Sequence, residues 1–264
     1  MNAASETIAR PPVIEMFDVV VATARAPDTA VISGVNWRVS LDDYWVIGGP
    51  TGSGKSDLLA TAAGLQRPLS GAHRLFGREL PDLHETERLR ERLRVGVVFE
   101  DGARPFPQLT VAENVALPLR YHRDWNDAMI RQRVGEMLDV TELSAFAGSA
   151  PSELARALVP RVGLARALAL DPEALLLDNP LAGLDPRQER WWLDFIASLA
   201  AGHRSMKSRK MTIMVACDDL RPWTSQGRQF ALLKENQFLP LGGRDDLERC
   251  NEPLLRDLTA AHSS

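Results

Sequence analysis

A glycine-rich segment that ends in a lysine and a hydroxyl residue has the chemistry to bind phosphate. It consists of Gly49, Pro50, Thr51, Gly52, Ser53, Gly54, Lys55 and Ser56. The glycines let the backbone curl so that several N–H groups point at phosphate oxygens, and a following helix adds its positive N-terminal end. Lys55 would reach the β and γ phosphates, and Ser56 would ligate magnesium. The spacing therefore predicts a P-loop for Mg-ATP; the alternative is a flexible glycine turn.

A second candidate residue is an acid that follows an apolar run. The run 174–177 ends in Asp178. Taken alone, such an acid usually marks a strand end that faces solvent. A magnesium-nucleotide site, however, needs a carboxylate at the end of a strand beside the P-loop. Asp178 is therefore the expected metal ligand, and the predicted cofactors are ATP and Mg²⁺.

The elements around these residues predict an α/β fold, that of a P-loop NTPase with a parallel doubly wound core sheet. Short β-rich runs between 13 and 47 predict an N-terminal antiparallel β subdomain, and the last run leads directly into the glycine-rich segment. Helical spacing follows over 56–65. Later strand-like runs at 95–99 and 211–217 alternate with helices, as is typical of a doubly wound sheet.

Three consecutive helical patterns predict a helical subdomain inserted between strands. They cover 111–121, 126–138 and 152–170. We expect one domain over 1–264 with four successive parts. These are 13–103 (β subdomain and P-loop core), 104–166 (helical subdomain), 167–222 (return to the core) and 223–264 (C-terminal hairpin and helix).

Composition and charge exclude several classes of protein. The chain has 264 residues, 45% of them hydrophobic, and a formal charge of −4, so we expect a globular protein without general attraction for nucleic acid. The one locally basic run, 203–210, is more typical of a solvated loop. Cys217 and Cys250 lack the spacing of a redox or zinc motif. With no secretion signal and no apolar run of roughly 20 residues, we expect a cytoplasmic protein.

Taken together, the motifs resemble the ATP-binding subunit of ABC transporters over nearly the whole chain. Beyond the P-loop and Asp178, the matching segments are 32–43 before the P-loop, the turn 64–71, the Q-loop strand 94–100 and the D-loop 182–185, which ends in Asp185. The resemblance implies a dimer with a second ATPase subunit, the same chain or a different one, beneath a membrane permease.

Within that family, the chain looks most like the ATPases that serve MCE-type lipid transport. The resemblance lies in 100–103, 109–120 and the ending 251–256. It implies that the complex moves a lipid or another hydrophobic substrate. It also implies that Phe106 to Tyr121 contacts the permease, which would place the protein on the inner face of the membrane.

Three residues depart from the family at positions that perform hydrolysis. Asn179 replaces the glutamate that polarises the attacking water, and a neutral amide cannot accept its proton. Asp218 replaces the switch histidine, and its charge opposes the γ phosphate. Glu100 replaces the Q-loop glutamine and could still contact magnesium. We therefore expect no intact catalytic residue, although each single change could be neutral drift in a working enzyme.

The signature sequence also departs from the family. Where the family has Leu-Ser-Gly-Gly-Gln, this chain has Leu154, Ala155, Arg156, Ala157 and Leu158. The family's glycines let backbone N–H groups approach the γ phosphate held by the other subunit, and a β-carbon blocks that approach. Pro160 removes a further donor near the helix start. With Asp185, this segment is the expected dimer interface, and a homodimer would have two defective sites.

Three functional hypotheses follow. The first is a pseudo-ATPase or regulatory subunit that binds Mg-ATP with impaired or absent hydrolysis. The second is an active transport ATPase in which an acid such as Glu100 replaces the missing glutamate. The third is a soluble nucleotide-binding adaptor that has no permease.

Overall fold

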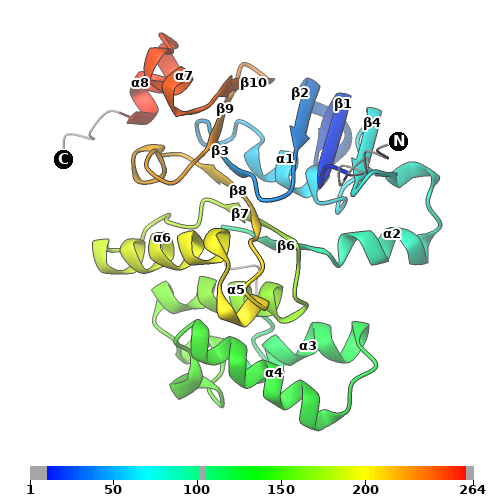
Figure 1. The fold of residues 1–264 in the computed structure, drawn as a ribbon, viewed down its shortest axis with the longest axis vertical. Helices are drawn as coiled ribbons and strands as arrows, with labels where there is room; N and C mark the ends of the chain where they lie inside the picture. The colour runs from blue at the N-terminus through cyan, green and yellow to red at the C-terminus, as the bar shows by residue number, and fades with distance from the viewer. Residues whose placement is uncertain (1–10, 101–104, 260–264) are drawn as a thin grey trace, which may run out of the picture.

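One twisted sheet of ten strands organises the molecule (Figure 1). The computed structural model describes residues 11–100 and 105–259. Across the sheet the strands are β5 (Arg78–Glu79), β4 (Ser70–Leu75), β1 (Ile14–Thr23), β2 (Ala26–Val39), β10 (Gln237–Gly242), β9 (Gln229–Lys234), β3 (Tyr44–Gly48), β8 (Thr212–Cys217), β7 (Ala174–Asp178) and β6 (Val95–Val98).

The sheet has an antiparallel part and a parallel part. Strands β5, β4, β1 and β2 pair antiparallel, whereas β9, β3, β8, β7 and β6 pair parallel. The β9–β10 hairpin lies between the two parts and joins β2 through the pair Gln237 and Ser33. The predicted α/β fold, with its antiparallel β subdomain and its inserted helices, is confirmed.

Eight α-helices are described, and three of them form a separate group. Figure 1 shows α3, α4 and α5 together at the end of the molecule opposite β1, β2 and β4. The helices are α1 (Lys55–Ala62), α2 (Glu85–Arg92), α3 (Val111–His122), α4 (Asp127–Val140), α5 (Val159–Ala169), α6 (Pro186–Ala201), α7 (Arg244–Arg249) and α8 (Pro253–Thr259). The expected subdomain boundary at 103/104 lies outside the described residues, as do 1–10 and the segment 101–103 that carries part of the lipid-transport resemblance.

The two faces of the parallel strands contribute to different cores, because side chains alternate along a strand. Leu175 and Leu177 of β7 lie in the core formed with α3, α4, α5 and α6. Leu176, between them, lies in the core formed with α1 and the antiparallel strands. The uninterrupted apolar sequence of β7 is therefore explained by burial on both faces.

The structure corrects two expected elements. The helix predicted over 152–170 begins only at Val159, after 3₁₀ turns at Pro151–Glu153 and Arg156–Leu158. Pro160 fits this boundary because proline is tolerated in the first turn of a helix. The tail contains two helices rather than one.

Helix α2 was not predicted because its sequence is almost entirely charged. Ion pairs hold it to the antiparallel part of the sheet: Arg78 after β4 contacts Glu87 at 2.6 Å and Glu91 at 3.3 Å. A helix whose contacts are mainly ionic has no clear apolar stripe in its sequence.

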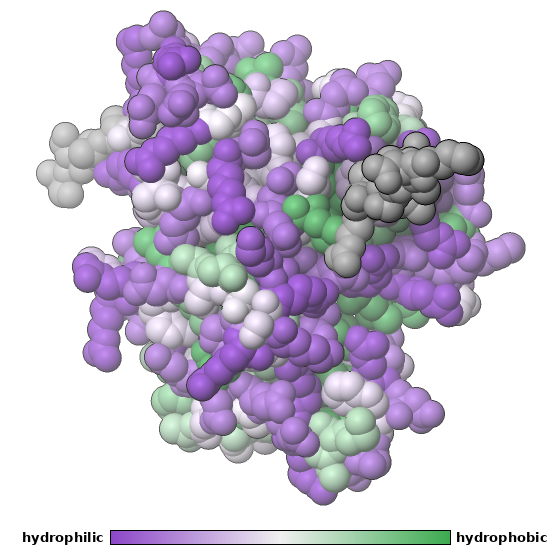
Figure 2. All heavy atoms as spheres, in the orientation of Figure 1, coloured by the Kyte–Doolittle hydropathy of each residue, from purple (hydrophilic) through white to green (hydrophobic). Residues whose placement is uncertain are grey.

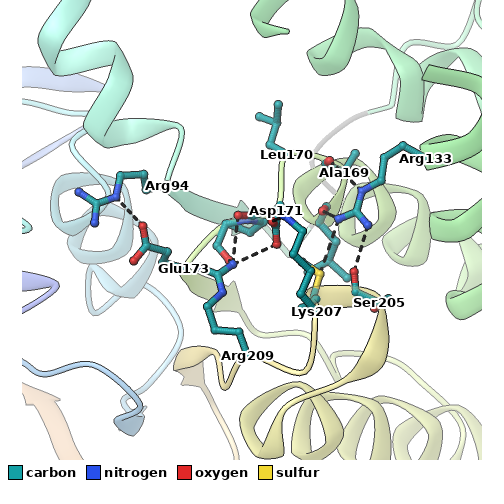
Figure 3. A network of polar contacts seen from close by, with 12 residues as sticks. Arg94, Arg133, Ala169, Leu170, Asp171, Glu173, Ser205, Lys207 and Arg209 are labelled. Carbon is teal, nitrogen blue, oxygen red and sulfur yellow. Dashed lines mark hydrogen bonds and ion pairs between the residues drawn. The ribbon is translucent and has the colours of Figure 1, made fainter. Parts of the chain in front are cut away.

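A polar network joins the helical group to the parallel strands (Figure 3). Arg133 of α4 donates hydrogen bonds to the backbone carbonyls of Leu168 and Ala169, at the end of α5, and of Ser205. Asp171 lies in the connection between α5 and β7, and its carboxylate forms ion pairs with the side chains of Lys207 and Arg209. The basic run 203–210, expected to be a solvated loop, is thus largely accessible at the surface, but two of its side chains are fixed to Asp171 by ion pairs.

Arg133→Ala should destabilise the fold by about 2 to 3 kcal/mol, because three carbonyl groups lose a charged donor. Arg131→Ala is the matched control, since Arg131 lies on the same helix with an exposed side chain. Urea unfolding of both variants provides the measurement. An equal effect in the two variants would contradict the importance of the network.

The burial of His73 predicts how the free energy of unfolding changes as the pH falls below 6.5. Its buried Nε2 lies 3.2 Å from the carbonyl oxygen of Ala62, and burial lowers the pKa of His73 from 6.5 to about 4. The unfolded chain therefore takes up a proton that the folded chain resists. The resulting stabilisation is complete above pH 6.5 and is lost as the pH falls from 6.5 to about 4, by about 3 kcal/mol.

His73→Gln should reduce this loss of stability, because glutamine keeps a donor for Ala62 but does not titrate. Exposed His122, changed to Gln, is the control. Stability at pH 7 and at pH 4 is measured by urea unfolding. If the native protein loses no more stability between pH 7 and pH 4 than His73→Gln does, His73 is not the group responsible.

No helix within 11–100 and 105–259 combines the length and apolar character that crossing a bilayer requires. On the face drawn in Figure 2, hydrophobic residues form small separate groups among hydrophilic ones.

Candidate functional site

Three neighbouring strands bring the candidate residues to one edge of the sheet. Strand β8 pairs with β3 on one side and with β7 on the other, all parallel. Parallel strands end at the same edge, and ligands of open α/β sheets bind there. The P-loop follows β3, Asp178 ends β7, and Asp218 directly follows β8. Asp218 is thus placed between the P-loop and Asp178.

The P-loop backbone has the turn that the glycines were expected to permit. Gly52 and Gly54 have φ values of 83° and 90°, in the region that residues with a β-carbon rarely adopt. A β-carbon on Gly54 would also lie 3.0 Å from the side chain of Val31. Helix α1 then begins at Lys55, with its N-terminal end at the loop. This arrangement fits the phosphates of a nucleotide.

Lys55 points back into the loop rather than toward solvent. Only 6% of the residue is exposed. Its Nζ donates to the carbonyl oxygens of Gly49, at 2.7 Å, and Pro50, at 2.9 Å. The same Nζ lies 2.5 Å from Oδ1 of Asp218, which makes the closest charged contact of the site.

Both oxygens of Asp218 have partners from the motifs around it. Oδ2 accepts from the Thr51 hydroxyl and from the Asn179 side-chain amide, each at 3.1 Å. Asn179 has a φ of 45°, a left-handed conformation that asparagine adopts more readily than most residues. The two residues expected to stand in place of the catalytic glutamate and the switch histidine therefore contact each other.

Asp178, Ser56 and Glu100 are the residues expected to hold magnesium. The Ser56 hydroxyl hydrogen-bonds Asp178, which is 3% exposed. Burial raises the pKa of Asp178, and the nearby charges of Glu100 and Asp218 raise it further, whereas Ser56 and Lys55 oppose the change. Among the described residues no three His, Cys, Asp or Glu side chains converge as ligands, so a metal ion here would depend on the nucleotide's phosphates as well.

A cleft of about 2000 Å³ extends from the P-loop across to the helical group. Arg25, in the turn between β1 and β2, lies among its lining residues. Arg92 of α2 and Arg166 of α5 also line it. The sequence analysis did not single out these two arginines, because only the tertiary structure brings α2 and α5 to the P-loop.

The signature segment lies on the opposite wall of this cleft. Ala155 and Arg156 are exposed, and Arg156 and Ala157 line the cleft. Leu154 was expected to lie in the dimer interface, but it is only 8% exposed and packs in the core of this chain. Leu158 is half-buried. The surface that a partner could contact is therefore narrower than the five-residue motif.

Asp185 has a structural contact that the sequence analysis did not assign. Its carboxylate accepts from the backbone N–H groups of Arg187 and Gln188 and caps α6. Asp185 is accessible at the surface, and its place in a dimer interface stays a prediction.

The segment expected to contact a permease is organised by Asn114. This buried side chain accepts from the N–H of Phe106 and donates to the carbonyls of Phe106, Leu109 and Thr110. Phe106 and Tyr121 are 43% and 77% exposed, whereas Leu109 is half-buried. The segment thus presents aromatic side chains at both of its ends.

Comparisons with known proteins agree with this geometry. A family model described as "ABC transporter" matches residues 32–182. The chain is 37% identical over 188 residues to the methionine import ATP-binding protein MetN 2 of Paraburkholderia xenovorans, covering 70% of this chain and 48% of that protein. It is 34% identical to a probable sulfate/thiosulfate import ATP-binding protein of Chlorella vulgaris, covering 75% and 79%. The chain therefore spans about half the length of some relatives and most of another.

Solved structures show the same fold. CbiO1 from Clostridium perfringens superposes with a TM-score of 0.75 at 22% identity, over 90% of this chain and 91% of that one. An ATP-binding cassette solved as a dimer with ADP and Pi has a TM-score of 0.75 at 26% identity, over 87% and 99%.

Proposed function

Because the chain belongs to the ABC transporter family, as an ATP-binding domain, we propose that it is a subunit that binds a magnesium nucleotide and hydrolyses it slowly or not at all. The observation that carries this proposal is the contact between Lys55 and Asp218, supported by Asn179. The P-loop would hold the phosphates, and Ser56, Asp178 and Glu100 would bind magnesium. The bound metal would supply charge neutralisation at the phosphates.

The proposal of poor turnover rests on the groups around the γ-phosphate position. Hydrolysis needs a base or a polarising group for water, and the Asn179 amide cannot take up a proton. At the switch position, Asp218 presents a carboxylate where a hydrogen-bond donor to phosphate would be needed. On the opposite wall, Arg156 and Ala157 replace residues that would have left the backbone accessible.

The alternative of an active ATPase has one observation in its favour. Glu100 lies close enough to Asp178 for its charge to raise the pKa of that carboxyl group. An acid at this position could accept a proton from water, so the experiment below includes it.

Turnover with Mg-ATP tests the proposal. We expect native protein to hydrolyse no faster than Lys55→Ala. Asn179→Glu alone should not restore activity, because it places a second carboxylate beside Asp218. The combined variant Asn179→Glu, Asp218→His, Ala155→Ser, Arg156→Gly, Ala157→Gly should raise turnover by about a hundredfold or more.

One further variant, Glu100→Gln, identifies the competing outcome when it is compared with Lys55→Ala. Native hydrolysis that disappears in both Lys55→Ala and Glu100→Gln would establish the active ATPase and overturn the proposal. Hydrolysis that survives both changes would indicate a contaminating enzyme.

The partners are proposed from the family and from an exposed groove. A groove of about 680 Å³ lies between α2 and the end of α3 and includes Leu89 and Tyr121, which are 38% and 77% exposed. We propose that a permease segment fills this groove and holds the protein at the inner face of the membrane. A second ATPase subunit would pair across the cleft.

The transported substrate stays a prediction. The resemblance to lipid-transport ATPases favours a lipid or another hydrophobic molecule. The relatives reported above are named for import of methionine and of sulfate or thiosulfate, so their names lend this substrate no support.

Tyr121→Asp and Leu89→Asp should each abolish co-purification of a membrane protein with the tagged chain, because a charge would be buried in the groove. Met129→Asp is the control, since Met129 is an apolar residue of α4 that is 46% exposed and does not line the groove. If native protein retains no membrane protein after mild detergent extraction, the soluble adaptor is favoured instead.

A further inference from the structure

We propose that the Asp218 carboxylate takes the place of a third phosphate in this P-loop, so that the site selects nucleoside diphosphates over triphosphates. The inference rests on the proposed nucleotide binding and adds the identity of the preferred nucleotide. It concerns affinity, whereas the proposal above concerns turnover.

The first argument is that every donor of the Lys55 ammonium group is already used. An ammonium group has three N–H donors. They are taken by the carbonyl oxygens of Gly49 and Pro50 and by Oδ1 of Asp218, at 2.7, 2.9 and 2.5 Å. A γ phosphate that approaches Lys55 must displace one of these partners, and Asp218 is the only anion among them.

The second argument is that Asp218 is bound as a phosphate oxygen pair would be. Its oxygens contact a lysine ammonium, a threonine hydroxyl and an asparagine amide, all of them donors to anions. Two of these donors, from Lys55 and Thr51, belong to the P-loop itself. The carboxylate therefore occupies an anion site that the chain has assembled from its own nucleotide-binding residues.

The third argument concerns position along the cleft. Asp218 contacts Asn179, which directly follows the proposed metal ligand Asp178. The carboxylate is thus at the metal side, where the terminal phosphate of a triphosphate would lie.

The electrostatic consequence differs for the two nucleotides. A diphosphate gives up the Lys55 contact to its β phosphate but can still use the backbone N–H groups of the loop and the start of α1, while the contact between Lys55 and Asp218 persists. A triphosphate brings further negative charge to the carboxylate, and like charges at close range repel. The Asp218 side chain is 39% exposed, so it can swing outward, but Lys55 is then left without its anion until the phosphate arrives.

The test is isothermal titration calorimetry of the full chain with Mg-ADP, Mg-ATP and a non-hydrolysable ATP analogue. We expect native protein to bind Mg-ADP at least about tenfold more tightly than Mg-ATP. Asp218→Asn removes the charge and keeps the shape, and should tighten Mg-ATP binding by about tenfold or more while changing Mg-ADP binding by less than about threefold.

One control and one additional variant accompany this test. Asp219→Asn removes the same charge from the next residue, whose carboxylate pairs with Arg221, and should leave the ADP-to-ATP ratio unchanged. Asp218→Ser is a second neutral variant in case Asp218→Asn folds poorly, which circular dichroism detects.

The outcomes are distinct. Equal tightening of both nucleotides, or no change, in the two Asp218 variants overturns the selectivity but leaves the pseudo-ATPase proposal standing. Mg-ATP binding seen only in the Asp218 variants supports the inference in its strongest form. If neither native protein nor any variant binds either nucleotide, the inference and the proposed nucleotide binding both fail.

Discussion

The parallel pairing of β3, β8 and β7 is the constraint on which the candidate site depends. Register in these pairs aligns Gly48 with Cys217 and Asp178 with Ala216. Residues that directly follow the three strands must therefore meet at one edge of the sheet. This places the P-loop, Asp178 and the residue after Cys217 close to one another. An aspartate in that last position inevitably faces the P-loop lysine.

That contact changes what the loop can do. In a low-dielectric, largely buried site a lysine and a carboxylate attract strongly, and each reduces the availability of the other to a third charged group. Lys55 is well buried, whereas Asp218 is partly open to solvent. The same loop geometry that fits a phosphate chain is thus combined with an internal anion. The proposed separation of nucleotide binding from hydrolysis rests on this combination.

The rest of the fold keeps the two walls of the cleft in place. Side chains alternate between two cores across the parallel strands, so the helical group and α1 pack on opposite faces of the same sheet. The network around Arg133 and Asp171 joins the helical group to the strands near the end of α5. Arg156 and the P-loop therefore line one cleft, whose two sides are held together by contacts far from the P-loop.

Local patterns in the sequence were sufficient for the P-loop, the α/β class and most strands. These features depend on short spacings, such as the glycines before Lys55, and on continuous apolar runs such as 174–177, which any burial on two faces requires. Helix α2 was not predicted, because its ion pairs with Arg78 lie outside the helix and its own charged sequence has no apolar stripe. The start of α5 at Val159 was also missed, since 3₁₀ turns and α-helices share short-range apolar spacing.

The sequence by itself determined that a glycine-rich phosphate-binding loop precedes a helix, and it placed an asparagine after Asp178 and an aspartate after the apolar run 211–217. Only the tertiary structure decided that Asp218 contacts Lys55 and that Asn179 supports this contact. The physical reason is strand order. Residues 55, 179 and 218 are far apart along the chain, and no local spacing specifies that β8 lies between β3 and β7.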